Sequence, residues 1–71
     1  MKTPRTLKDI QNDPRVERVN YEGEEDGYWV YLKDEYFDYD FDSFNPTHQI
    51  HEWSIKKLCQ RFKGVRKANQ S

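Results

Sequence analysis

The residues best suited to chemistry lie at positions 34–42, which read DEYFDYDFD. Three carboxylates alternate there with aromatic rings: Asp38, Asp40 and Asp42. This is the spacing of the first ligands of an EF-hand calcium loop, which also needs glycine at its sixth position and glutamate at its twelfth. The chain has Ser43 and Gln49 at those two positions. The stretch therefore does not predict a calcium site.

Histidine and cysteine give no stronger sign of a metal or of catalysis. His48 and His51 stand three residues apart in a segment that we expect to be extended, so their side chains point to opposite faces. Zinc needs about four converging ligands, and Cys59 falls on the apolar face of a predicted helix. The spacing shows no nucleophile with a base and an orienting group. We expect no enzyme activity, no catalytic residue, no metal and no cofactor.

Charge is divided sharply along the chain, although the formal net charge is only −1. Residues 22–42 carry nine carboxylates against one lysine, whereas residues 53–67 carry six basic side chains and no acid. Such a division indicates two surfaces of opposite sign. Either surface is a candidate for binding a charged macromolecule.

The order of local patterns predicts an α+β fold. A capping-box-like Thr6–Asp9 pair and the Asp13-Pro14 step bound a short helix at about 6–12. Period-2 alternation and aromatic or β-branched residues predict the strands. The elements expected in order are a helix at 6–12, strands at 15–22, 28–33 and 48–52, and a helix within 53–64. Residues 36–41 fit either an edge strand or a loop.

The last helix is the best-defined element, with Ser54 as its N-cap and Gly64 as its end. Its apolar positions recur at helical spacing: Ile55, Leu58, Cys59 and Phe62. We expect them to pack on an antiparallel sheet of three to four strands, against Val19, Val30 and Leu32. Trp29 and Tyr31 make the opposite face of the central strand equally apolar. The sequence therefore leaves open which face of the sheet the helix covers.

Length and composition predict one small domain, residues 1–71, with an ordered core at about 5–66. The 71 residues include one cysteine, which excludes a scaffold of internal disulfides. No apolar run approaches the ~20 residues of a membrane span, and the first residues do not resemble a signal peptide. We expect a cytoplasmic protein.

Two resemblances bear on function. The α-β-β-β-α order resembles a double-stranded-RNA-binding domain, and SIKKL at 54–58 is similar to the basic start of that family's last helix. The segments DPRV (13–16), DGYWVYLK (26–33) and THQIHE (47–52) resemble a loose set of small bacterial and phage-associated proteins. The second resemblance implies a bacterial or mobile-element origin and no particular activity.

Carboxylates spaced along an extended segment imitate a phosphate backbone, and tyrosines supply rigid contact area. We therefore predict a protein-binding module that mimics nucleic acid, by analogy with phage inhibitors of CRISPR or restriction systems. Its partner would be a protein with a basic nucleic-acid-binding surface. The predicted partner-binding residues are Glu24, Glu25, Asp26, Asp34, Glu35, Tyr36, Asp38, Tyr39, Asp40 and Asp42, with the aspartates of 38–42 facing solvent. The alternative is direct nucleic-acid binding by the last helix, through Lys56, Lys57, Arg61 and Lys63.

Overall fold

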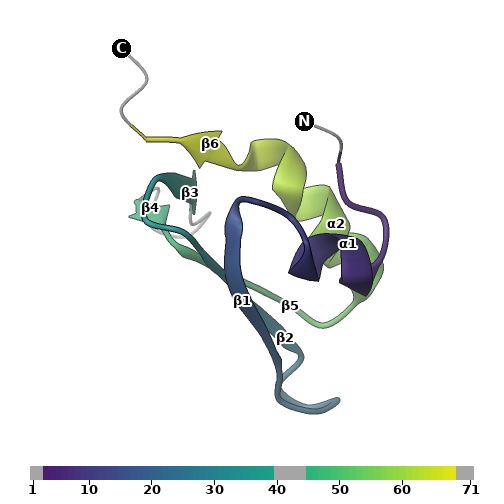
Figure 1. Cartoon of the computed structure of the whole chain (residues 1–71). Coiled ribbons are helices and arrows are strands. Elements are labelled where there is room, and N and C mark those ends of the chain that lie inside the picture. The colour runs from purple at the N-terminus through teal and green to yellow at the C-terminus, as the bar shows by residue number, and fades with distance from the viewer. Residues whose placement is uncertain (1–2, 40–44, 69–71) are drawn as a thin grey trace.

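The computed structural model describes residues 3–39 and 45–68, which form an α+β domain (Figure 1). A short helix is followed by five strands, a second helix with a 3₁₀ turn, and a last short strand, and the strands form two sheets. The elements are α1 Leu7–Gln11, β1 Val16–Tyr21, β2 Tyr28–Leu32, β3 Tyr36–Tyr39, β4 Pro46–Thr47, β5 Gln49–Glu52, α2 Ile55–Arg61, the 3₁₀ turn η1 Phe62–Gly64, and β6 Arg66–Lys67. The α+β class and the C-terminal helix expected from the sequence are confirmed.

Both helices begin at the residues that local chemistry favours. The hydroxyl of Thr6 accepts a hydrogen bond from the backbone N–H of Asp9, 3.1 Å away. The hydroxyl of Ser54 likewise accepts from the N–H of Lys57 at 3.2 Å. Each cap satisfies one of the backbone donors that the first helical turn leaves unpaired.

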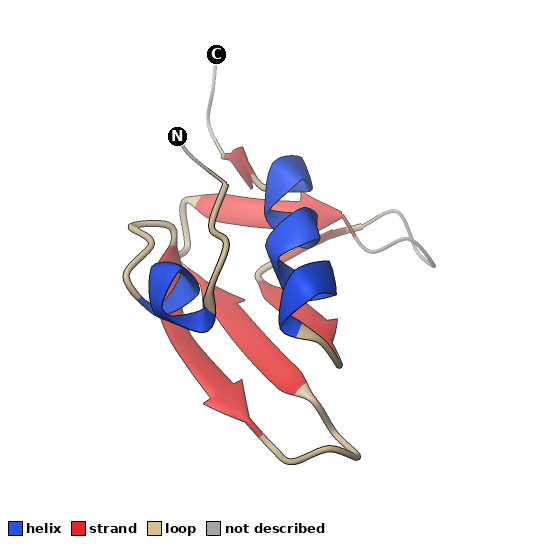
Figure 2. Cartoon of the chain, turned by 90° about the vertical axis from the view of Figure 1, so that its right-hand side faces the viewer, coloured by secondary structure: helices blue, strands red, loops and turns tan. Residues whose placement is uncertain are grey.

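The larger sheet is antiparallel and has the strand order β1-β2-β5. Its central row joins Val19, Val30 and Ile50 across the three strands. Both helices lie on the same side of this sheet (Figures 1 and 2). Val30 and Ile50 are fully buried together with Leu58 of α2 and Ile10 of α1. The helices therefore cover the face that bears Val30 and Leu32, which settles the choice that the sequence left open.

The opposite face of this sheet, hereafter the outer face, carries Trp29 and Tyr31 from β2. Each pairs with a residue of a neighbouring strand: Trp29 lies opposite His51, and Tyr31 lies opposite Arg18. Neither α1 nor α2 covers these side chains, because both helices pack on the other side (Figure 2).

Residues 36–39 form a strand, but in a second sheet. The order there is β4-β3-β6, and β6 comes from the segment that follows η1. The backbone N–H of Ala68 also donates to the carbonyl of Glu35 at 2.6 Å. This bond extends the pairing of the last segment with the start of β3 as far as residue 68.

Candidate functional site

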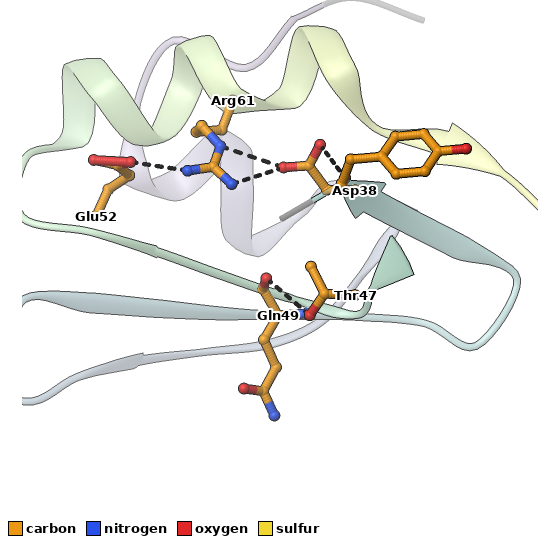
Figure 3. Close-up of polar contacts among 6 residues, drawn as sticks. Asp38, Thr47, Gln49, Glu52 and Arg61 are labelled. Atoms are coloured by element: carbon orange, nitrogen blue, oxygen red, sulfur yellow. Dashed lines mark hydrogen bonds and ion pairs between the residues drawn. The ribbon is translucent and has the colours of Figure 1, made fainter. Parts of the chain in front are cut away.

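Asp38 belongs to the interior of the molecule. Only 7% of the residue is exposed, and its Oδ2 lies 3.0 Å from a terminal guanidinium nitrogen of Arg61. Another nitrogen of the same guanidinium lies 3.1 Å from Oε2 of Glu52 (Figure 3). Oδ1 of Asp38 accepts from the backbone N–H of Tyr39 at 2.9 Å. Arg61 thus joins β3, β5 and α2 through one half-buried cation.

The prediction that the aspartates of 38–42 face solvent is wrong at Asp38. The alternation along β3 exists as expected, but Asp38 points inward to Arg61, while the rings of Phe37 and Tyr39 meet edge to face at 5.4 Å on the other side. An inward carboxylate is stable here because a hydrogen-bonded cation offsets the cost of burying it. Asp40 and Asp42 lie outside the described residues.

The remaining predicted acids fall into two separate groups. Glu24, Glu25 and Asp26 are exposed in the turn between β1 and β2, whereas Asp34 and Glu35 are exposed between β2 and β3. The two groups are at opposite ends of β2, which implies a separation of roughly 17–20 Å from the rise per residue of a strand. They do not form one continuous acidic row.

Of the two predicted tyrosines, Tyr36 is partly buried and packs against the core. Tyr39 is 45% exposed and lies on the second sheet. Tyr36 therefore contributes mainly to packing. Tyr39 remains accessible, at a distance from the turn that holds the exposed glutamates.

The turn at residues 22–27, hereafter the acidic turn, is shaped by its two glycines. Gly23 and Gly27 have φ values of 96° and 75°, which L residues with side chains rarely adopt. A Cβ at position 27 would meet the carbonyl oxygen of Glu52 at 2.7 Å. The N–H of Gly27 donates to the carbonyl of Gly23, closing the turn. Glycine at 27 therefore lets the acidic turn lie directly against the segment between β5 and α2.

Two ring N–H groups, one from β5 and one from the residue that follows β5, hold the acidic turn in place. The indole Nε1 of Trp53 donates to the carbonyl oxygen of Glu25 at 3.0 Å. Nε2 of His51 contacts the carbonyl oxygen of Asp26. Since a carbonyl only accepts, Nε2 is the protonated nitrogen of that ring. These contacts use the backbone of the turn and leave its carboxylates in solvent.

Trp29, His51 and Trp53 form a continuous line of rings, hereafter the aromatic row. The rings of Trp29 and His51 are stacked with centroids 4.1 Å apart and planes 8° from parallel. The rings of His51 and Trp53 are 4.3 Å apart and tilted by 52°. Trp53 is 59% exposed, the largest exposure among the large hydrophobic residues described. The aromatic row and the acidic turn therefore form one surface, and this is the candidate binding site.

Sequence reasoning assigned Glu24, Glu25 and Asp26 to a binding site but missed the aromatic row. A signal existed: His51 and Trp53 share a face of an extended segment because they are two residues apart. Pairing Val30 with Ile50 as two buried positions would then have placed Trp29 opposite His51. That register is a long-range choice, which a single sequence constrains weakly.

The predicted basic surface is only partly present as expected. Lys56, Lys57 and Lys63 are exposed, but Arg61 is half-buried and ion-paired to Asp38 and Glu52. The ion pairs of Arg61 hold its guanidinium against β3 and β5, unlike the side chains of the three lysines. The three lysines remain available to a ligand.

The described parts of the chain contain neither a metal-binding cluster nor an activated thiol. Within residues 3–39 and 45–68, no group of three or more His, Cys, Asp and Glu residues is placed to hold a metal ion. Burial raises the pKa of the Cys59 thiol, and the charge of Asp9 raises it further. A thiol in this state is a poor nucleophile and a poor ligand. No described helix has the length and apolar character that a membrane-spanning segment needs.

Comparison of the chain with protein-family models, with curated proteins and with solved structures gives no match. The helix-strand-strand-strand-helix order behind the resemblance to double-stranded-RNA-binding domains is present as α1, β1, β2, β5 and α2, with β3 and β4 inserted. This shared order concerns the topology of the chain alone.

Proposed function

We propose that the protein is a non-enzymatic protein-binding module that uses the acidic turn and the aromatic row to hold a basic surface of its partner. One observation carries the proposal: the indole N–H of Trp53 is bonded to the turn, while 59% of the residue stays exposed. Tryptophan is among the residues most enriched at the centres of interfaces. An exposed tryptophan fixed in place loses little conformational entropy when a partner binds it.

The charge of the partner follows from the acidic turn. Glu24, Glu25 and Asp26 are exposed, and none of them forms an ion pair with another described residue. Three neighbouring carboxylates favour a positively charged partner, speed its association and make binding sensitive to salt. Where that partner surface normally holds nucleic acid, the module acts as an inhibitor by occupying it.

The test is retention of a partner from a bacterial lysate at low and high salt. The variant Glu24→Gln, Glu25→Gln, Asp26→Asn removes the three charges with little change in shape. A matched control, Asp34→Asn with Glu35→Gln, removes exposed acids at the other end of β2. We expect wild type and control to retain one partner in a salt-sensitive manner and the turn variant to lose it. If the turn variant retains that partner with unchanged salt dependence, the proposal is overturned.

A second function rests on a different observation, the exposure of Lys56, Lys57 and Lys63 on the helical side of the molecule. Lys56 and Lys57 on α2 match the basic helix that the resemblance to double-stranded-RNA-binding domains implies, and Lys63 follows them on η1. Under this alternative, Lys56→Glu with Lys57→Glu abolishes binding to duplex RNA or DNA, and single substitutions lower its salt dependence. A duplex shifted by wild-type protein at physiological salt, and not by the double variant, would favour this second function.

A further inference from the structure

The aromatic row ends in a ring that is exposed to solvent. Trp29 and His51 cover one another at 4.1 Å and are both partly buried. On the far side of His51, Trp53 is the last ring of the row and the most exposed. Its only polar atom is already bonded to Glu25, so what it offers a ligand is the face of its π-system. Such a face attracts a cation more strongly than the rings of tyrosine or phenylalanine do.

The outer face of the sheet already stacks one guanidinium on a ring. The central guanidinium carbon of Arg18 lies 4.4 Å from the ring centroid of Tyr31. A planar guanidinium can lie flat on an aromatic ring and still donate hydrogen bonds from its edge, which the compact ammonium of lysine cannot do. The same geometry on Trp53 would leave the donors of an incoming arginine free to reach carboxylates.

The turn that is bonded to this ring also carries carboxylates for those donors. The turn that accepts the Trp53 hydrogen bond carries Glu24, Glu25 and Asp26, all exposed. Their backbone carbonyls at 25 and 26 are occupied by the row. The open ring and the acceptors are therefore complementary to a planar cation in both shape and charge.

The size of the outer face decides between an extended segment and a second folded domain. Three strands with about five paired positions each span roughly 14 Å by 17 Å. This amounts to a few hundred Å², against the ~800 Å² per partner of a standard interface. A second copy of the chain would need more surface than this face provides. An extended segment, which contacts a narrow track, fits it.

We propose that the aromatic row takes an arginine side chain from an extended, arginine-rich segment of the partner. The guanidinium lies on the open face of Trp53 and donates to the carboxylates of Glu24, Glu25 and Asp26. This inference rests on the proposed function and names its partner chemistry. It distinguishes arginine from lysine, which a purely electrostatic site would bind alike.

The chain is suited to a direct test because its only two tryptophans are both in the aromatic row. Intrinsic tryptophan fluorescence would be titrated with an arginine-rich peptide and with a lysine-rich peptide of equal length and charge. We expect the arginine peptide to bind more tightly and to change the emission. Trp53→Ala should weaken it about 3- to 30-fold and abolish the preference for arginine. Trp53→Phe, which keeps a smaller ring, should retain part of the preference, and Tyr39→Ala, an exposed ring on the other sheet, should retain all of it.

Equal affinity of wild-type protein for the two peptides, with no effect of Trp53→Ala, would overturn the inference. The proposed function would still stand if the variant of the acidic turn lost its partner in the lysate experiment. A single-stranded oligothymidylate that changes the emission, while neither peptide does, would also overturn it, because the row would then be stacking bases. The comparison of peptides uses the wild-type chain and does not depend on any variant folding.

Discussion

The acidic turn and the strand β3 both carry acids that the sequence assigned to a single acidic surface, and the structure places these acids in opposite environments. In β3 the carboxylate of Asp38 is buried against Arg61, and the ring of Tyr39 is outside. In the acidic turn the carboxylates are outside, and the backbone is bonded to the ring nitrogens of His51 and Trp53. An acid therefore belongs to the interior in β3 and to the solvent-exposed surface in the acidic turn.

The difference shows what decides the role of a carboxylate. β3 passes near the end of α2, where Arg61 supplies a hydrogen-bonded cation to an inward-facing acid. The acidic turn extends beyond the end of the sheet, where water solvates its acids and no described cation pairs with them. Composition alone therefore does not separate a buried structural acid from a solvent-exposed one.

The largest expected effect comes from breaking the core that both regions share. Leu58 of α2 is fully buried against the sheet. Leu58→Ala should lower the free energy of unfolding by about 2–5 kcal/mol, the usual cost of a large cavity in a core. Urea unfolding measures this, with Lys56→Ala on the exposed side of the same helix as control. A Leu58→Ala protein as stable as the control would refute the packing of α2 on the sheet.

Asp38 should be the acid whose loss costs the most. Asp38→Asn removes one of the two carboxylates paired with Arg61. The guanidinium still pairs with Glu52, and the Arg61 side chain is 23% exposed to solvent. We expect a loss of about 2 kcal/mol, below the full cost of breaking a completely buried pair. A double-mutant cycle with Arg61→Gln should give a clear coupling energy. If Asp38→Asn is no more destabilising than Asp34→Asn, the two regions do not differ as described.

Asp13 is another ion-paired acid with a largely buried side chain, and its contribution to stability should depend on pH. Burial alone would raise its pKa, but hydrogen bonds from the side chain and backbone of Arg15, together with its charge, outweigh burial and hold the pKa below the ordinary 3.8. A depressed pKa stabilises the fold above the unfolded value, and this contribution is lost as pH falls through the folded one. Asp13→Asn should therefore flatten the fall in stability below about pH 4. Urea unfolding across that range checks it, and an unchanged acid limb would contradict it.

The smallest effect on stability should come from the acidic turn. Glu24→Gln, Glu25→Gln, Asp26→Asn leaves the glycines and both ring hydrogen bonds in place, so the free energy of unfolding should change by at most ~0.5 kcal/mol. Thermal unfolding followed by circular dichroism would show this. A large loss of stability would mean that these carboxylates hold the turn together and would weaken their assignment to binding.

Much of the fold could be predicted because its signals are local. Ser54 and Thr6 cap the helices as the sequence indicated, and Leu58, Cys59 and Phe62 are buried on the predicted face. These features depend on residues a few positions apart. Capping chemistry and helical periodicity specify them without reference to the rest of the chain.

The rest depends on contacts between distant segments. Period 2 predicts that Asp38 and Tyr39 point to opposite sides, but not which side is inside, because that depends on Arg61, 23 positions away. The pairing of β3 with β6 brings Phe37 opposite Arg66, with no local signal in either segment. For the proposed binding surface, the sequence indicated the acids of the turn, whereas the aromatic row depends on the register of β2 with β5.

The most direct test of the account is a map of which residues respond to a basic ligand. Two-dimensional ¹H–¹⁵N NMR spectra of the wild-type protein would be recorded during titration with the arginine-rich peptide. We predict changes in the chemical shifts of the Trp53 indole N–H and of the backbone amides of the acidic turn, while the amide signals of β3 do not change. Shifts confined to β3, with the indole signal of Trp53 unmoved, would contradict the assignment of the acidic turn and aromatic row as the binding site.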